Sequence, residues 1–239
     1  MAAARSRYPP RHVALERALS KLGLASRSDA RRLIRDGAVT VNGRAVTNPL
    51  SAVVPERDMI TVGNVTPPPR PWRTIAFHKP RGSVTTRRDP QGRTTVFDLL
   101  GDAGAGLVAV GRLDLASSGL LLLTTDTQLA ERLTNPEHGV VRRYVVTVRG
   151  RVGDDDLEIL RAGVDGLQAA SVTIRKRSNR ETHLIVELRE GKNREIRRLF
   201  AAVGREVTRL LRVAYGPIEL GPLRPGEWRE LSAAECARS

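Results

Sequence analysis

The sequence is poor in cysteine and aromatic residues, and each shortage excludes a class of protein or site. Cys236 is the only cysteine, so an internal disulfide and a cysteine-rich zinc site are both excluded. The four histidines are scattered without the spacing of metal ligands, and we predict no metal site. With three Phe, three Tyr and two Trp, the chain is not expected to stack single-stranded bases on a row of rings.

Long apolar runs are also missing. No uninterrupted run approaches the roughly 18 residues of a membrane-spanning helix, so no membrane partner is expected. The first ten residues lack the apolar core of a secretory signal and are typical of a loose basic tail. These absences favour a soluble, cytoplasmic protein.

Positive charge, in contrast, is abundant. The formal net charge is +14 over 239 residues, and among the 40 basic residues only Lys21, Lys79, Lys176 and Lys192 are lysines. Guanidinium groups bind phosphate bidentately, which favours an RNA partner. A genome biased toward arginine codons would give the same ratio of Arg to Lys, so the net charge carries this inference.

The segment 11–65 is predicted to form a small domain. Apolar residues at helical spacing between Leu15 and Leu22 predict a short helix that ends near Gly23. A capping-box-like start at Ser26 predicts a second helix over 29–36. The segment 39–46 alternates around Asn-Gly, which predicts a hairpin with a type I′ turn, and 58–62 predicts a further strand.

Four arginines lie on or next to the second predicted helix: Arg27, Arg31, Arg32 and Arg35. They could neutralise several phosphates, although a solvated helix face is the alternative.

Four prolines follow within 66–73, which indicates a semi-rigid linker and a domain boundary.

The remainder, 74–236, is predicted to be a second domain of strands with few helices. Strands are expected at 74–78, 84–86, 143–148, 171–174 and 183–188, and a helix capped by Asp126 is expected to stop at Asn135-Pro136. Repeating beta-alpha-beta units are missing. The pattern therefore favours an α+β fold with a mixed, largely antiparallel sheet.

Asp114 stands out within this second domain. An apolar run over 107–110 reaches Gly111, and another leaves from Gly119, so Asp114 is predicted at the mouth of a sheet. From these residues alone, Asp114 could equally cap a turn or pair with Arg112.

A helix with a basic first turn is expected after Gly191. Its apolar stripe consists of Ile196, Leu199, Phe200 and Val203. Arg197 lies beside this stripe, where a side chain reaches into a cleft, but spacing alone does not select Arg197 over Arg194.

The motifs resemble a known family. Gly-Arg-Leu-Asp at 111–114, followed by Ser-Gly-Leu-Leu-Leu-Leu-Thr-Thr-Asp at 118–126, resembles the catalytic loop of the rRNA pseudouridine synthases of the RsuA/RluB type. The segment 22–37 with the following Val-Thr-Val-Asn-Gly is similar to the RNA-binding domain first described in ribosomal protein S4. The resemblance spans most of the chain.

The resemblance also implies roles for single residues. Asp114 corresponds to the catalytic aspartate, Arg197 to the arginine that pairs with it, and Tyr144 to the tyrosine that sits against the target base. The implied substrate contacts are Arg112, Leu210, Lys192 and Arg194, with Leu210 lining the base pocket, and the implied RNA contacts are Arg27, Arg31, Arg32 and Arg35. A core-packed aromatic is the alternative for Tyr144.

The implied reaction converts uridine to pseudouridine in rRNA without net redox change, so no cofactor is expected. An ionised carboxylate would attack the sugar or the uracil ring, or act as a base at the ribose. Likeness at 85–87 and 95–100 favours large-subunit rRNA over small-subunit rRNA as substrate, with ribosomal RNA or an assembling subunit as partner of a monomer. A non-catalytic RNA-binding assembly factor is the alternative of another class.

Overall fold

A computed structural model of the protein describes residues 12–22, 24–25, 27–55, 57–63 and 73–238. The chain divides into two compact units, residues 1–72 and 73–239, and each is described by itself. Within the described residues, no helix combines the length and the apolar character needed to cross a membrane.

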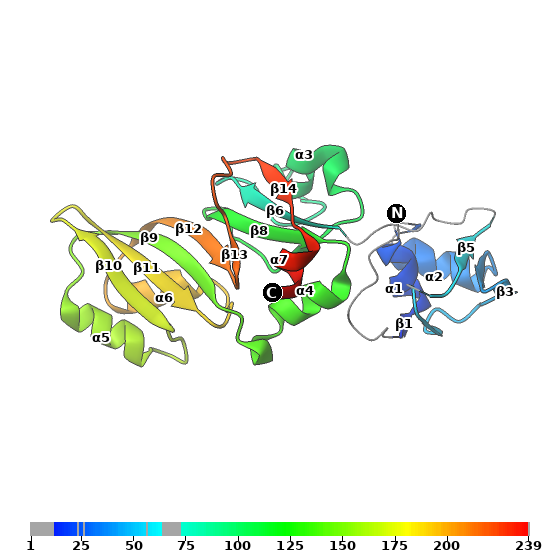
Figure 1. Ribbon diagram of the computed structural model, residues 1–239, viewed down its shortest axis with the longest axis horizontal. Coiled ribbons are helices and arrows are strands. Elements are labelled where there is room, and N and C mark those ends of the chain that lie inside the picture. The colour runs from blue at the N-terminus through cyan, green and yellow to red at the C-terminus, as the bar shows by residue number, and fades with distance from the viewer. Residues whose placement is uncertain (1–11, 23, 26, 56, 64–72, 239) are drawn as a thin grey trace. The chain divides into compact units, whose positions relative to one another are not determined.

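The first unit packs two helices against short strands (Figure 1). Its elements are β1 (Val13–Ala14), α1 (Leu15–Lys21), α2 (Arg27–Arg35), β2 (Val39–Val41), β3 (Arg44–Ala45), β4 (Ala52–Val53) and β5 (Ile60–Val62). Leu15, Ala18 and Leu19 are fully buried, so the face predicted from their spacing is the packed one. The second helix begins two residues before the predicted 29–36 and ends one residue earlier. The predicted signals at Gly23 and Ser26 lie outside the described residues.

The predicted hairpin is present in this unit. Antiparallel strands β2 and β3 are joined by Asn42 (φ 52°) and Gly43 (φ 79°). Two consecutive positive φ angles are the signature of a type I′ turn, which matches the twist of the strands. The Asn42 side chain also donates to Asp58 Oδ1 at 3.0 Å and accepts from the Met59 amide at 2.9 Å. These bonds connect the turn to the start of β5.

In the described part of the second unit, nine strands form one sheet in the order β10-β11-β9-β12-β8-β6-β14, with β7 and β13 paired off this path. The strands are β6 (Thr74–Lys79), β7 (Val108–Val110), β8 (Ser118–Thr124), β9 (Arg142–Arg149), β10 (Ser171–Arg177), β11 (Glu181–Leu188), β12 (Val207–Tyr215), β13 (Ile218–Glu219) and β14 (Trp228–Glu230). Neighbours are antiparallel except β8 and β12, which are parallel. The predicted α+β class with a largely antiparallel sheet is confirmed.

Helices cover this sheet. They are α3 (Val96–Leu100), α4 (Thr127–Thr134), α5 (Asp154–Ala162), α6 (Glu195–Ala202) and α7 (Ala233–Arg238), with 3-10 turns at Gly101–Gly104 and Pro136–His138. Asp126 caps α4 as predicted, since its Oδ1 accepts from the amides of Gln128 and Leu129. The sequence did not predict α5 or α7.

The predicted strand at 84–86 is wrong. Val84 forms only an isolated bridge with Thr95. Pro80 follows β6 and has no amide to donate to a ladder, and the Thr85 hydroxyl donates to the Leu113 carbonyl at 3.0 Å. This segment therefore supports the Asp114 loop and adds no strand to the sheet.

The central strands are buried on both faces. Along β8, Leu121 and Leu123 belong to one core cluster, and Leu120 and Leu122 belong to the cluster on the opposite face. Side chains alternate across a strand, so a strand covered on both sides is apolar at every position. The four consecutive leucines are explained in this way.

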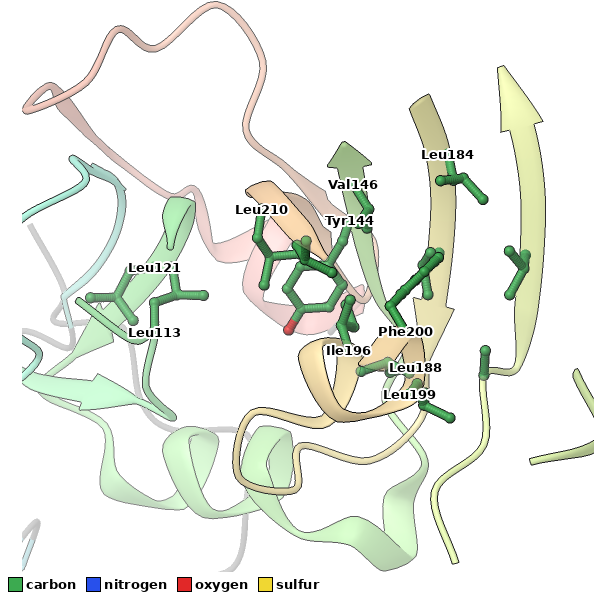
Figure 2. Close-up of a cluster of buried hydrophobic side chains, with 14 of the residues drawn as sticks. Leu113, Leu121, Tyr144, Val146, Leu184, Leu188, Ile196, Leu199, Phe200 and Leu210 are labelled. Carbon is green, nitrogen blue, oxygen red and sulfur yellow. The ribbon is translucent and has the colours of Figure 1, made fainter. Parts of the chain in front are cut away.

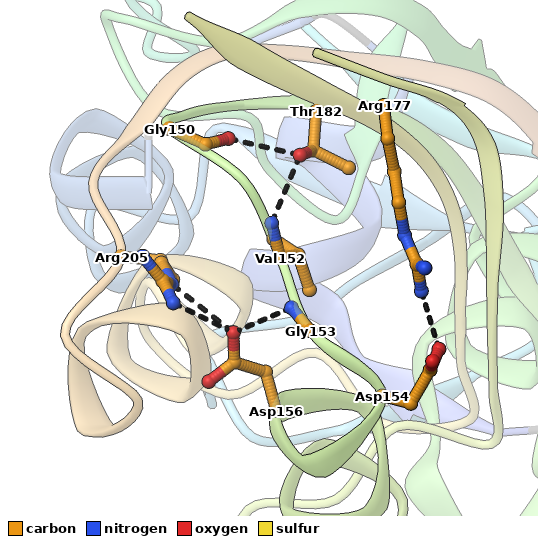
Figure 3. A network of polar contacts seen from close by, with 8 residues as sticks. All are labelled: Gly150, Val152, Gly153, Asp154, Asp156, Arg177, Thr182 and Arg205. Atoms are coloured by element: carbon orange, nitrogen blue, oxygen red, sulfur yellow. Dashed lines mark hydrogen bonds and ion pairs between the residues drawn. The ribbon is translucent and has the colours of Figure 1, made fainter. Parts of the chain in front are cut away.

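Polar contacts fix the start of α5 (Figure 3). The Asp156 carboxylate accepts from the Gly153 amide at 2.9 Å and from the Arg205 guanidinium at 2.9 and 3.1 Å. The Thr182 hydroxyl donates to the Gly150 carbonyl at 2.9 Å and accepts from the Val152 amide at 3.0 Å. Since Arg205 follows α6, this network links the two helices on the sheet.

Candidate functional site

Asp114 lies in the loop between β7 and β8 and is half-buried. Its carboxylate accepts no hydrogen bond and forms no ion pair within 4.0 Å with any residue that the structure describes. The neighbouring Arg112 is exposed. Neither turn capping by the Asp114 side chain nor an Arg112 ion pair is therefore seen, and the carboxylate is left available.

Lys79 at the end of β6 anchors this loop. Its side chain has no exposed surface, and its Nζ donates to the carbonyls of Pro80 at 3.1 Å, Asp114 at 3.2 Å and Ser117 at 3.0 Å. The pKa of Lys79 is lowered to about 8, mainly by burial and to a smaller extent by repulsion from Arg212, while attraction to Asp114 opposes the shift. Sequence reasoning did not select Lys79, although a lysine ending an apolar strand in an arginine-rich chain was an available signal.

Residues after β6 hold the same loop from its other side. The Gly82 amide donates to the Leu115 carbonyl at 2.8 Å. The Thr85 hydroxyl bonds both the carbonyl and the amide of Leu113, at 3.0 and 3.3 Å. The backbone around Asp114 is thus fixed by contacts on both sides of the carboxylate.

Arg197 on α6 reaches the loop as well. Its guanidinium donates to the carbonyls of Val207 at 2.7 Å and Ala116 at 3.4 Å. Burial and repulsion from Arg194 lower the pKa of Arg197, and attraction to Asp114 opposes this, although no direct ion pair forms between them within 4.0 Å. Arg197 is half-buried while Arg194 and Arg198 are exposed, so the position beside the apolar stripe faces the loop.

Tyr144 on β9 and Leu210 on β12 belong to one large core cluster of the second unit. Their exposed fractions are 7% and 8%, and the cluster also holds Leu113 and Ile196, the chain neighbours of Asp114 and Arg197. Figure 2 shows the Tyr144 ring beside Leu210 and Ile196, with its hydroxyl directed away from Leu184. That hydroxyl has no hydrogen-bond partner among the described residues and is not fully buried. The ring is packed as a core residue, and its polar end remains accessible.

The remaining candidates near α6 differ in their contacts. Lys192 Nζ pairs with Glu190 at 2.6 Å and donates to the Gly166 carbonyl at 2.7 Å. Arg194 is exposed, has a positive φ of 48°, and precedes α6. Glu195 accepts from the Lys192 amide at 3.0 Å, and burial raises the pKa of Glu195. Arg194 is therefore free to meet a ligand, whereas the Lys192 side chain is already engaged.

Two cavities border the Asp114 loop. One of about 420 Å³ is lined by Val84, Thr85, Thr86, Arg88, Asp89, Pro90, Arg93, Arg112, Leu113, Asp114 and Leu115. Another of about 260 Å³ is lined by Arg81, Ala116, Ser118, Arg209, Leu210 and Leu211. Asp114 and Leu115 thus line the first cavity, whereas Ala116 and Ser118 line the second. Tyr144 and Arg197 line neither.

The arginines of α2 in the first unit are unequal. Arg31 forms a two-pronged ion pair with the buried Glu16. Arg32 lies 3.9 Å from Asp29, and its side chain is 68% exposed. Arg35 is exposed and forms no ion pair with a described residue. The side chain of Arg27 lies outside the described residues.

No group of three or more potential metal-ligating His, Cys, Asp or Glu side chains occurs among the residues that the structure describes.

Comparisons with known proteins agree with this organisation. The family model described as RNA pseudouridylate synthase matches residues 73–202, and the S4 domain model matches residues 15–56. The chain is 36% identical to a protein of Aquifex aeolicus named uncharacterized RNA pseudouridine synthase, over 95% of this chain and 93% of that protein. It is 41% identical to ribosomal large subunit pseudouridine synthase B of Salmonella typhimurium, over 92% of this chain and 80% of that protein. A crystal structure of a pseudouridylate synthase matches with a TM-score of 0.65 and 27% identity, over 95% of this chain and 99% of that one. The chain belongs to the RNA pseudouridylate synthase family and carries an S4 domain before its family segment.

Proposed function

We propose that this protein isomerises a specific uridine of ribosomal RNA to pseudouridine, with Asp114 as the catalytic residue. The observation that carries the proposal concerns the Asp114 carboxylate, which forms no hydrogen bond or ion pair with the described residues. The loop that bears it is held in place by Lys79, Thr85 and Arg197. A catalytic group is effective when its backbone is fixed and its functional atoms are not already bound.

The chemistry fits a single carboxylate. The bond between the ribose anomeric carbon and N1 of uracil breaks, and the same sugar carbon forms a new bond to C5. The C5 hydrogen leaves as a proton and N1 gains one, so atoms and electrons balance without a redox partner. An ionised carboxylate serves in each route: attack on the sugar, attack on the ring, or proton abstraction from the ribose.

Tyr144 and Leu210 are proposed to receive the uracil ring. To reach Asp114 the nucleotide leaves its stack, which costs on the order of a few kcal/mol. Packing of the ring against an aromatic and an aliphatic side chain offsets part of this cost. Arg197, Arg112, Lys192 and Arg194 would supply positive charge around the nucleotide, with Arg197 also positioning the loop through Ala116.

Large-subunit rRNA is the proposed substrate. The support is the 41% identity to ribosomal large subunit pseudouridine synthase B, together with the similarity at 85–87 and 95–100. The α2 arginines Arg27, Arg31, Arg32 and Arg35 are proposed to contribute phosphate contacts, which position the RNA without reading its sequence. Small-subunit rRNA is the competing substrate.

The partner would be free rRNA or an assembling ribosomal subunit in the cytoplasm. One chain carries both an RNA-binding domain and a candidate catalytic site, so we infer that it acts as a monomer. A non-catalytic RNA-binding assembly factor is disfavoured because Asp114, Tyr144 and Arg197 are all present and Arg197 contacts the Asp114 loop.

The decisive experiment is a transcriptome-wide map of pseudouridine in cells with and without the protein. Loss of one rRNA site, restored by wild type and not by Asp114→Asn, is the expected result. Purified protein should form pseudouridine at the same site of unmodified rRNA without any added cofactor. Tight binding to that RNA without pseudouridine formation would favour the assembly factor.

A further inference from the structure

The smaller cavity beside the Asp114 loop combines cationic and apolar groups. Its lining includes two arginines, Arg81 and Arg209, and two leucines, Leu210 and Leu211. Both arginines are exposed, and neither side chain forms an ion pair or hydrogen bond with a residue that the structure describes. Arginine side chains elsewhere in the chain, such as Arg73, Arg93 and Arg205, are paired with carboxylates. The cavity therefore presents cations that the protein itself does not neutralise.

Arg197 lies next to this cavity, since its guanidinium donates to the carbonyl of Ala116, which lines the cavity. Arg197 experiences repulsion from Arg81 and Arg194, and the attraction that opposes this repulsion comes from Asp114. Clustered like charges raise the energy of the free protein. An anionic ligand that bridges them relieves that repulsion and gains charge-assisted hydrogen bonds.

The position of the cavity indicates which anion fits. Ala116 lines it, and Ala116 lies two residues after Asp114, so their Cα atoms are at most about 7 Å apart. The Ser118 hydroxyl in its wall makes only a 3.5 Å contact to the Leu210 carbonyl and can be redirected at little cost. A group bound here lies within reach of the strand whose nucleotide occupies Asp114.

We propose that Arg81 and Arg209 bind a backbone phosphate of the nucleotide adjacent to the target uridine. This subsite holds the RNA strand immediately beside the flipped uridine and supplies binding energy next to the reacting bond. The inference rests on the proposed function, since it requires an RNA strand at Asp114.

The test uses short RNAs that contain the mapped uridine, in which one phosphate flanking it, on either side, is replaced by an uncharged methylphosphonate. For wild type, one of the two replacements should lower kcat/KM by about tenfold, the order expected for a charge-assisted hydrogen bond. Arg81→Gln and Arg209→Gln should each lower kcat/KM on the unmodified RNA by a similar factor. The methylphosphonate that lowers kcat/KM of wild type should cause no further loss of kcat/KM in the Arg81→Gln, Arg209→Gln double variant.

Arg175→Gln is the matched control. Arg175 is exposed on β10, at the end of the sheet order away from β8, and it forms no ion pair with a described residue. This variant should retain wild-type kcat/KM and full sensitivity to the methylphosphonate. Circular dichroism and thermal unfolding of each variant check that it folds.

Several outcomes would overturn the subsite. A methylphosphonate effect of equal size in wild type and double variant places the contact elsewhere. Competition by inorganic phosphate that depends on Arg81 and Arg209, without any methylphosphonate effect, assigns the cavity to free phosphate. Absence of wild-type turnover at every uridine is a different result, because it defeats the proposed function itself.

Discussion

The Lys79 ammonium donates a hydrogen bond to the Asp114 carbonyl at 3.2 Å, from a side chain with no exposed surface. Lys79 and Asp114 are separated by 35 positions in the chain, and the bond joins the end of β6 to the candidate catalytic loop. All three donors of the ammonium are used on backbone carbonyls. A buried lysine is costly, so its presence here supports a positioning role.

Lys79→Met is expected to slow turnover more than it weakens RNA binding. Methionine fills similar space and donates no hydrogen bond, so the loop loses its tether while the carboxylate remains. Misplacement by about 1 Å can cost on the order of 100-fold in rate. Single-turnover rates and RNA affinities should be compared with those of Lys176→Met, an exposed lysine on β10 that should behave as wild type. Equal losses in rate and affinity would argue against loop positioning.

The buried lysine should also make stability depend on pH. The pKa of Lys79 is lowered from 10.5 to about 8, so between these values the unfolded chain binds the proton that the folded chain has lost. Stability therefore rises with pH through this window, whereas below pH 8 both states are protonated and the full cost of burial applies. The unfolding free energy of wild type minus that of Lys79→Met should increase by roughly 3 kcal/mol from pH 7 to above 10. A pH-independent difference would contradict the assigned pKa.

Asp114→Asn should abolish turnover and leave RNA affinity nearly unchanged. The amide has almost the same shape as the carboxylate but carries no charge, and removal of a catalytic nucleophile or base typically costs roughly 10⁴-fold or more. The described contacts of Asp114 are made by its backbone, so the fold should tolerate the change. Pseudouridine formation and RNA binding are the two measurements. A matching loss of affinity would identify Asp114 as a binding residue.

Local patterns predicted the local elements of this protein. The Asn42-Gly43 turn, the Asp126 cap and the packed face of α6 each depend on residues a few positions apart, and each is present. Tyr144, Leu210 and the chain neighbours of Asp114 and Arg197 belong to one core cluster, and the roles that the family resemblance implies for these residues stay predictions.

Long-range contacts were not predictable in the same way. The Lys79 tether depends on the pairing of β6 with β8, and Arg31 pairs with Glu16 across 15 positions. The failed strand at 84–86 has the same origin, because Thr85 bonds Leu113 across 28 positions. Such contacts follow from sheet register and helix packing, which a single sequence does not encode as spacing.

In the first unit, Arg32 and Arg35 are the sharper probes of RNA binding. Both are exposed and neither takes part in the Arg31–Glu16 ion pair, so Arg32→Ala with Arg35→Ala should weaken binding without unfolding the domain. Each lost phosphate contact should reduce the slope of log binding constant against log salt concentration by about 0.7 to 0.9. Arg31→Ala should instead lower the melting temperature, since the buried Glu16 loses this partner. An unchanged salt slope in the Arg32 and Arg35 variant would remove α2 from the RNA interface.

Gly119→Ala should destabilise the second unit strongly. Gly119 has φ +108°, and an added Cβ would lie 2.2 Å from the Arg212 carbonyl oxygen, where β8 runs parallel to β12. The methyl group would force apart the two strands that carry Ser118 and Leu210, at a cost of about 3 kcal/mol or more from strain and overpacking. Gly221→Ala is the matched control, because its φ is also positive, at +59°, and nothing lies within 4 Å of the added Cβ. Its loss should be limited to backbone strain, on the order of 1 kcal/mol. Equal destabilisation of the two variants in chemical denaturation would mean that the close approach of β8 and β12 at Gly119 does not constrain the fold.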